Sequence, residues 1–232
     1  AEKHFDYTFR TGENAFTKLF GKNIFEYAND QDIGDVDIVA MAKIQKEYTN
    51  AIRSRLFQIY DFSKFRHIVD VGGGDGTFLI EILKNTPDHV NGTVFDQPNV
   101  VAKATEKIAS QNLSERCNAV GGSFFEEVSV EGDCYILKFI LNDWKDEKCV
   151  KIIRNISQRM KRDSKLLIVE IVDSEEGDSY AQMMDYFLWF GFGGGQRKLS
   201  HFKRLLNEAN LDVVKSIQIG DLNFSIIETA LQ

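Results

Sequence analysis

The sequence of 232 residues is poor in several features that mark particular classes of protein. It has only two prolines and three cysteines, Cys117, Cys134 and Cys149, which are odd in number and widely spaced. This pattern argues against a disulfide framework and favours a reducing cytoplasm. No apolar run approaches the roughly 20 residues that span a bilayer, and the first ten residues lack a signal peptide's apolar stretch. We therefore expect a soluble, cytoplasmic protein without a membrane partner.

Positive charge is also scarce, because 28 Lys and Arg face 35 Asp and Glu, which gives a formal net charge of −7. A nucleic-acid partner is therefore not expected. The four histidines are scattered and no Cys or His pair has zinc-ligand spacing, so we predict no metal site. Hydrophobic residues are abundant at 43%, with 12% aromatic, and this composition suits a packed globular core.

The spacing of apolar residues changes after Phe65. From Asn14 to Tyr60 they recur at helical intervals, which predicts a helical lead-in over 1–64. Over 65–232 short apolar runs alternate with amphipathic stretches of roughly ten residues or more, the pattern of βαβ units in an α/β doubly wound domain. The segments at about 211–218 and 222–230 are joined only by GDLN, which is too short for a crossover helix. They should therefore pair antiparallel at the end of the sheet.

The stretch HIVDVGGGDGTFLIEIL predicts a strand, a glycine-rich loop that begins at Gly72, and a helix. The glycines let the backbone approach a ligand closely and take positive φ. A nicotinamide or flavin fingerprint would need glycine at residue 77, which is Thr77, so an oxidoreductase of that kind is disfavoured. Asp96 ends the next strand, where a carboxylate can accept both hydroxyls of a ribose. Loop and carboxylate together predict an adenosine-type pocket, although each alone also fits a tight turn or a helix cap.

Six stretches follow one another along the chain: VDVGGGDG, TVFDQPNV, GGSFFEEV, YILKFILNDWKDEKCVKIIRN, LLIVEIV and GGGQRKLSHFKRLLNEANL. In order and spacing they resemble the class I S-adenosylmethionine-dependent methyltransferases, most closely the small-molecule O-methyltransferases of the caffeate and hydroxyindole type. The resemblance implies a seven-stranded, mostly parallel, Rossmann-like sheet with a C-terminal antiparallel hairpin. It also implies S-adenosylmethionine as cofactor and methyl transfer to an oxygen of a small-molecule or carrier-bound acceptor in specialised metabolism.

The lead-in resembles the helical region that precedes the cofactor domain in that family and contributes to its acceptor pocket. Family members usually carry a further N-terminal dimerisation domain of roughly 100 residues. We therefore expect this chain to be part of a longer polypeptide with a further domain.

The same resemblance implies which residues bind the cofactor. They are Asp70, Gly72, Gly74, Asp96, Gln97, Ser123, Phe124, Lys138 and Trp144. The glycines would face the methionine part, and Asp96 would bind the ribose. Ser123 stands where the family commonly has Asp, so a hydroxyl would replace the carboxylate that takes the adenine amino group. Phe124 would lie against adenine with Trp144 as the opposite wall, although ordinary core packing also explains both aromatic residues.

Methyl transfer from a sulfonium to an oxygen requires in-line alignment and loss of the hydroxyl proton. In the resembling family the base is the His of a His-Asp-Trp triplet. Here the triplet is Asn142, Asp143 and Trp144, and Asn cannot accept a proton. Glu170 matches a Glu that orients the base in that family, whereas Gln196 replaces its second supporting Glu. The resemblance thus gives Asn142, Asp143, Glu170 and Gln196 as catalytic positions, two of which have lost an ionisable group.

Three interpretations of this departure stay open. In the first, the acceptor is already acidic, so that proximity to the methyl donor suffices for transfer and Asn142 hydrogen-bonds the acceptor oxygen. Alternatively, Glu170 or Asp143 is the base, which requires a carboxylate with a raised pKa in a closed pocket. In the third interpretation the domain binds the cofactor but is catalytically degenerate or repurposed, because fold alone does not fix function.

The acceptor pocket is expected between the lead-in helices and the segment YAQMMDYFLWFGFGGG. Methionine and aromatic surfaces adapt to apolar ligands, and here they precede a glycine run. A core helix would explain the same aromatic spacing. We predict acceptor contacts from Met41, Met183, Met184 and Phe187.

Overall fold

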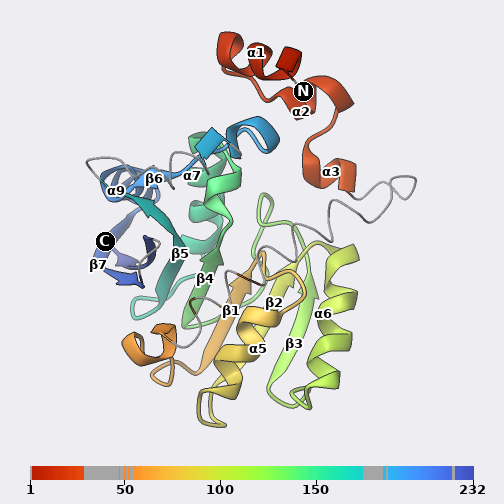
Figure 1. The fold of residues 1–232 in the computed structure, drawn as a ribbon. Helices are drawn as coiled ribbons and strands as arrows, with labels where there is room; N and C mark the ends of the chain where they lie inside the picture. The colour runs from red at the N-terminus through yellow and green to blue at the C-terminus, as the bar shows by residue number, and fades with distance from the viewer. Residues whose placement is uncertain are drawn as a thin grey trace.

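The computed structural model describes residues 2–28, 47, 50, 52, 55–174, 185–186, 188–220 and 223–232. Three short helices form the start of the lead-in: α1 (Glu2–Thr11), α2 (Ala15–Phe20) and α3 (Ile24–Ala28). They lie at the top of Figure 1, beyond the carboxyl ends of the parallel strands. Asn14 caps α2 by accepting a hydrogen bond from the Thr17 N–H, and Gly21 ends it at φ +71°.

The sheet has the strand order β3-β2-β1-β4-β5-β8-β7. Its parallel strands are β1 (His67–Val71), β2 (Asn91–Asp96), β3 (Cys117–Gly121), β4 (Cys134–Lys138) and β5 (Lys165–Asp173). The hairpin of β7 (Leu211–Ile219) and β8 (Phe224–Leu231) is antiparallel, with β8 bonded to β5. A two-residue strand that the sequence did not predict, β6 (Arg197–Lys198), pairs with the end of β5. The predicted α/β fold with its C-terminal hairpin is confirmed.

Helices cover both faces of the sheet, so successive residues of a strand enter different cores. On β1, Ile68 packs into a cluster with α5 (Thr77–Lys84) and α6 (Pro98–Ser110). The next residue, Val69, packs into a second cluster with α7 (Asp146–Ser157) and α9 (Leu199–Asn207). On β4, Ile136 and Leu137 divide in the same way. In Figure 1, α5 lies in front of the sheet and α6 at its right, beside β3, whereas α7 and α9 lie at the upper left.

The end of the lead-in is packed against the sheet domain. Leu56 and Phe62 are buried in the cluster that contains α5. The Tyr60 hydroxyl donates a hydrogen bond to Glu228 Oε2 on β8 at 2.5 Å. The predicted division into 1–64 and 65–232 stays a prediction. Among the described residues, no helix is both long and apolar enough to cross a membrane.

Candidate active site

The glycine loop joins the carboxyl end of β1 to the start of α5. Gly72, Gly74 and Gly76 have φ values of +74°, +59° and +77°, which L side chains rarely adopt. A Cβ on Gly72 would lie 2.4 Å from Ile140 Cδ1, so the loop is packed tightly at its base. A Cβ on Gly74 would meet no atom of the described part of the chain within 4 Å. The loop therefore leaves room for a ligand at Gly74.

Asp96 lies at the carboxyl end of β2, beside this open part of the loop. Its Oδ2 accepts a hydrogen bond from the Gly74 N–H at 2.8 Å, and its Oδ1 accepts one from the Gln97 N–H at 2.7 Å. Burial raises the pKa of Asp96, while these two donors act in the opposite direction. A carboxylate has about four lone-pair positions, so both oxygens can still accept further bonds. The structure thus brings together the loop and the carboxylate that the sequence pairs.

Below the loop, Asp70 on β1 is a buried carboxylate with spare hydrogen-bonding capacity. Its side chain is 1% exposed, and its Oδ2 has no hydrogen-bond partner in the described part of the chain. Burial raises the pKa of Asp70 and lowers the pKa of Lys138, at the end of β4. The opposite charges of the two side chains moderate both shifts. An unpaired buried carboxylate oxygen is costly, so it marks a position where a ligand group can bind.

Ser123 and Phe124 follow β3 on the other side of the loop. The Ser123 hydroxyl accepts a hydrogen bond from the Phe125 N–H at 3.3 Å, so it already caps a local turn. Phe124 reaches the base of the loop, where its Cε1 would lie 3.5 Å from a Cβ on Gly72. Phe124 is thus placed beside the loop, as expected of a wall for the adenine.

Trp144 is part of an aromatic cluster that reaches the lead-in. Its indole is 9% exposed, stacks on Phe25 of α3 at 5.3 Å between ring centroids, and meets Phe125 edge-on at 4.8 Å. Lys148 Nζ lies 4.7 Å from the centre of the same ring system. Trp144 therefore couples the lead-in to the sheet domain, beyond the role expected of it as one wall of a pocket.

The backbone N–H groups of the turn after β4 are held by Glu170. This turn is the 3₁₀ helix η1 (Leu141–Asp143). Glu170 Oε1 accepts hydrogen bonds from the Leu141 N–H at 2.7 Å and the Asn142 N–H at 3.2 Å. The side chain is 1% exposed, and burial raises the pKa of Glu170 to about 7. In this arrangement Glu170 orients the turn that carries Asn142.

The carbonyl groups of the same turn are held by Arg197, a residue to which the sequence assigned no role. Its guanidinium donates to Leu141 O at 2.7 Å, to Trp144 O at 2.6 Å and to Asp146 Oδ1 at 3.1 Å. The Cys149 thiol donates to the same two carbonyls, at 3.2 and 3.3 Å. Arg197 is 5% exposed, so these charge-assisted bonds are shielded from water. The only sequence signal for this role is its place directly after Gln196.

The glycine run lies directly against Asn142. The Gly195 N–H donates to Asn142 O at 2.9 Å, and a Cβ on Gly194 would lie only 2.0 Å from that oxygen. The Gln196 N–H donates to Asp185 Oδ1 at 2.7 Å. Asn142 Oδ1 and Gln196 Oε1 are buried, and within the described residues neither accepts a hydrogen bond. The structure therefore brings Glu170 and the segment that carries Gln196 together around the turn of Asn142 and Asp143, the four predicted catalytic positions.

Asp143, which follows Asn142 in the turn, lines a pocket of about 550 Å³ between the lead-in and the turn, together with Phe192 and residues of α1–α3. Its side chain is 7% exposed, and burial, with a contribution from Glu170, raises its pKa well above the usual range. The predicted acceptor contacts, Met41, Met183, Met184 and Phe187, lie outside the described residues.

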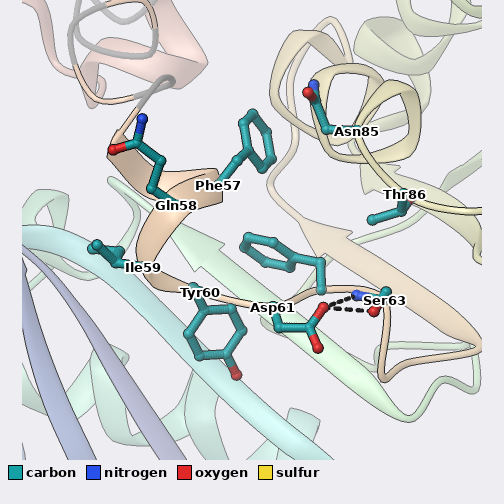
Figure 2. A pocket seen from close by; sticks show the side chains of 9 residues that line it. Phe57, Gln58, Ile59, Tyr60, Asp61, Ser63, Asn85 and Thr86 are labelled. Carbon is teal, nitrogen blue, oxygen red and sulfur yellow. Dashed lines mark hydrogen bonds between the residues drawn. The ribbon is translucent and has the colours of Figure 1, made fainter.

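A second pocket, of about 370 Å³, lies at the opposite end of α5 from the glycine loop. Figure 2 shows Tyr60, Asp61 and Ser63 on one side of it, with Asn85 and Thr86 on the other. The Asp61 carboxylate accepts hydrogen bonds from both the N–H and the hydroxyl of Ser63, at 2.9 and 2.6 Å. Because its charged group is satisfied within the protein, we assign no ligand to this pocket.

Comparison with known proteins agrees with this geometry. A model of the O-methyltransferase domain matches residues 3–211. A phenazine O-methyltransferase from Lysobacter antibioticus is 36% identical over 197 residues, which are 84% of this chain and 57% of that protein. The solved structure of a mitomycin 7-O-methyltransferase matches with a TM-score of 0.92 at 28% identity, over 99% of this chain and 67% of that one.

An O-methyltransferase from neocarzinostatin biosynthesis, solved with S-adenosylmethionine and 2-hydroxy-5-methyl naphthoic acid, matches with a TM-score of 0.88 at 26% identity. That match covers 99% of this chain and 67% of the other. The chain spans about three fifths, 57% to 62%, of the length of the curated relatives that it matches first. Since the domain model covers residues 3–211 of 232, this chain belongs to the O-methyltransferase domain family.

Proposed function

We propose that this chain is the catalytic domain of an S-adenosylmethionine-dependent methyltransferase that transfers a methyl group to an oxygen of a small molecule. The observation that carries the proposal is the hydrogen bond between the Gly74 N–H and Asp96 Oδ2 at 2.8 Å. It joins the open glycine loop to a carboxylate that can take the hydroxyls of a ribose. A solved relative that contains S-adenosylmethionine supports this choice of nucleoside.

The residues present fit such a cofactor. The loop at Gly72 and Gly74 would face its methionine part, and Asp96 and Gln97 would hold its ribose. The unpaired Oδ2 of Asp70 and the ammonium of Lys138 lie below, where they can meet the charged groups of an amino acid. Ser123 and Phe124 would contact the adenine from the β3 side, and Trp144 from the turn after β4. When bound, the cofactor supplies an electrophilic methyl group on a sulfonium.

The chain's own contribution to the reaction is alignment. Glu170 and Arg197 hold the N–H and C=O groups of one turn from opposite sides, which fixes the position of Asn142. Gly195 adds a third restraint through Asn142 O. Positioning of this kind can supply a large part of the rate enhancement of a displacement reaction.

The acceptor class is proposed from the relatives, one of which is named for a phenazine and another solved with a naphthoic acid. By analogy this chain would act on a small aromatic acceptor in specialised metabolism. Met41, Met183, Met184 and Phe187 would contact this acceptor on one side of the pocket. A carrier-bound acceptor stays a prediction. We place the protein in the cytoplasm, because Cys117, Cys134 and Cys149 are free and buried thiols that suit a reducing compartment.

Isothermal titration with S-adenosylmethionine and S-adenosylhomocysteine tests the cofactor. The Asp96→Ala variant should bind about 5- to 150-fold more weakly, because charge-assisted hydrogen bonds worth about 1 to 3 kcal/mol are lost. Asp88→Ala is the matched control, because its side chain is 99% exposed and pairs only with Arg116 among the described residues. No binding by the unaltered protein at about 1 mM cofactor would remove the proposal.

A second candidate, a domain that binds the cofactor without catalysis, is favoured by one observation. Asn142 and Gln196 place amides at two buried positions where the resembling family has a His and a Glu. This candidate requires cofactor affinity with no methyl transfer to any acceptor. Radiolabelled transfer assays on the cofactor-binding protein distinguish the two functions.

A further inference from the structure

The turn after β4 offers an amide where methyl transfer to a neutral hydroxyl would need a proton acceptor. Ile140, which precedes this turn, packs against the base of the glycine loop at Gly72. Asn142 is 6% exposed, and its Oδ1 accepts no hydrogen bond from the described residues. A carboxamide has two N–H donors and one carbonyl acceptor but no basic site at neutral pH. Asn142 can therefore stabilise an acceptor oxygen but cannot take its proton.

Of the four histidines in the sequence, none whose side chain is described has a hydrogen bond to this turn. His67 begins β1 and His89 precedes β2. Both therefore lie at the amino ends of these strands, whereas the glycine loop lies at the carboxyl end of β1. His201 Nε2 on α9 lies 2.7 Å from Asp146 Oδ2. His4 belongs to α1. The imidazole that commonly serves as a general base is thus not placed at this turn by the described part of the chain.

The two buried carboxyl groups near Asn142 serve other purposes. Glu170 Oε1 already accepts two backbone N–H groups, and protonation would weaken the bonds that hold the turn. Burial raises the pKa of Glu170, whereas Arg197 and the backbone N–H groups of the turn favour its ionised form. Burial, with a contribution from Glu170, raises the pKa of Asp143 well above its usual range and so disfavours its ionised form. Because Glu170 is engaged in holding the turn and the ionised form of Asp143 is disfavoured, we assign neither group as the base.

We infer that the acceptor is a hydroxyl compound that is already ionised when it binds: a phenol or enol acidified by a conjugated carbonyl, quinone or ring nitrogen. The inference rests on the proposed function and specifies its substrate class. The Asn142 amide N–H donates to the oxyanion and orients one of its lone pairs. That lone pair forms the O–CH₃ bond as the S–CH₃ bond breaks, and the bonding electrons return to sulfur to give a neutral thioether. The hydroxyl proton has gone to solvent before binding, so no base is consumed.

Initial rates of radiolabelled methyl transfer by the full-length protein test this class from pH 6 to 9. The acidic probes are 4-nitrophenol and 1,4-dihydroxy-2-naphthoic acid, which is bound in a solved relative. Phenol is the comparison, because like the Tyr side chain it ionises only near pH 10. At pH 7 an acidic probe should react about 100-fold faster than phenol or more. Phenol keeps its proton at this pH, and the protein lacks the general base that would contribute at least that factor. The rate should follow the ionisation of each acceptor.

Three results would overturn the inference. The first is an inflection at one pH for all acceptors, which would identify a base on the protein. The second is a phenol rate that equals the rate of the acidic probes. The third is no transfer to either acidic probe by protein that binds S-adenosylhomocysteine. Failure to bind S-adenosylmethionine would instead contradict the proposed function, so the two failures are distinguishable.

The Asn142→His variant adds an independent readout. An imidazole at this position would supply the missing base and speed the reaction of phenol. The ratio of the 4-nitrophenol rate to the phenol rate should therefore fall about tenfold or more. The control is Asn85→His, which adds an imidazole at the far end of α5, beside the pocket in Figure 2, and should keep the parent ratio. An unchanged ratio in an Asn142→His protein that still binds S-adenosylhomocysteine would contradict the inference. The pH profiles of the unaltered protein stand whether or not this variant folds.

Discussion

At the scale of single residues, Arg197 is the side chain on which the geometry of the turn most depends. In Arg197→Gln the carbonyls of Leu141 and Trp144 lose charged donors. We expect turnover to fall about 10- to 100-fold and the free energy of unfolding to fall by about 2 kcal/mol, with cofactor affinity within about threefold. Steady-state kinetics, chemical denaturation and titration with S-adenosylhomocysteine measure the three effects.

Arg204→Gln is the matched control for this change. Arg204 donates to the same carboxylate, Asp146 Oδ2, at 2.8 Å, but its side chain is 60% exposed and no described contact joins it to the turn. Its loss should leave turnover unchanged, because exposed ion pairs contribute little. Arg197→Lys should recover part of the turnover, since an ammonium keeps the charge but not the fork of donors. Equal losses in Arg197→Gln and Arg204→Gln would contradict a positioning role.

At the scale of elements, the glycine run 193–195 and the turn at η1 behave as one unit. A Cβ on Gly194 would overlap Asn142 O at 2.0 Å, and this neighbour is backbone that cannot rotate away. Gly194→Ala should therefore displace the turn and lower turnover about tenfold or more, while cofactor binding is retained. Gly191→Ala should leave both unchanged, because a Cβ there meets no atom of the described residues within 4 Å. Kinetics that fail to separate the two variants would show that the contact is not needed.

At the scale of the whole molecule, buried carboxyl groups make stability depend on pH. Glu170 titrates at about 7 in the fold and at 4.5 when unperturbed, so between these values the folded state holds a proton that the unfolded chain has lost. Stability from this group is full below pH 4.5 and is lost as the pH rises through 7. Between pH 6 and 7.5 the cofactor-free protein should lose about 1 kcal/mol through Glu170 alone.

Urea denaturation of the protein and of Glu170→Gln at both pH values measures this contribution. The variant keeps an acceptor oxygen for the turn but does not ionise, so its stability should fall by about 1 kcal/mol less over the same interval. The comparison also cancels His67, whose pKa burial lowers and which therefore acts in the opposite direction. Identical pH dependence in both proteins would mean that Glu170 is not the titrating group.

Local patterns in the sequence predict much of this molecule. The run from β1 into the glycine loop, the carboxylate at the end of β2 and the antiparallel hairpin each depend on residues that are close together in the chain. The clamp on the turn could not be predicted in this way. Arg197 and Leu141 are brought together only when β6 pairs with the end of β5, and Trp144 meets Phe25 only when the lead-in folds back. Such contacts depend on packing that no short pattern encodes.

The strand order also constrains how this molecule can assemble during synthesis. β8 follows β7 in the chain but lies between β5 and β7, and it is bonded to both. A nascent chain that ends before Phe224 leaves β7 without a partner and β5 with an open edge, which can template pairing between unfinished copies. β7 can therefore join the sheet only through β8, and the ribosome has to release almost the whole domain before that edge is closed.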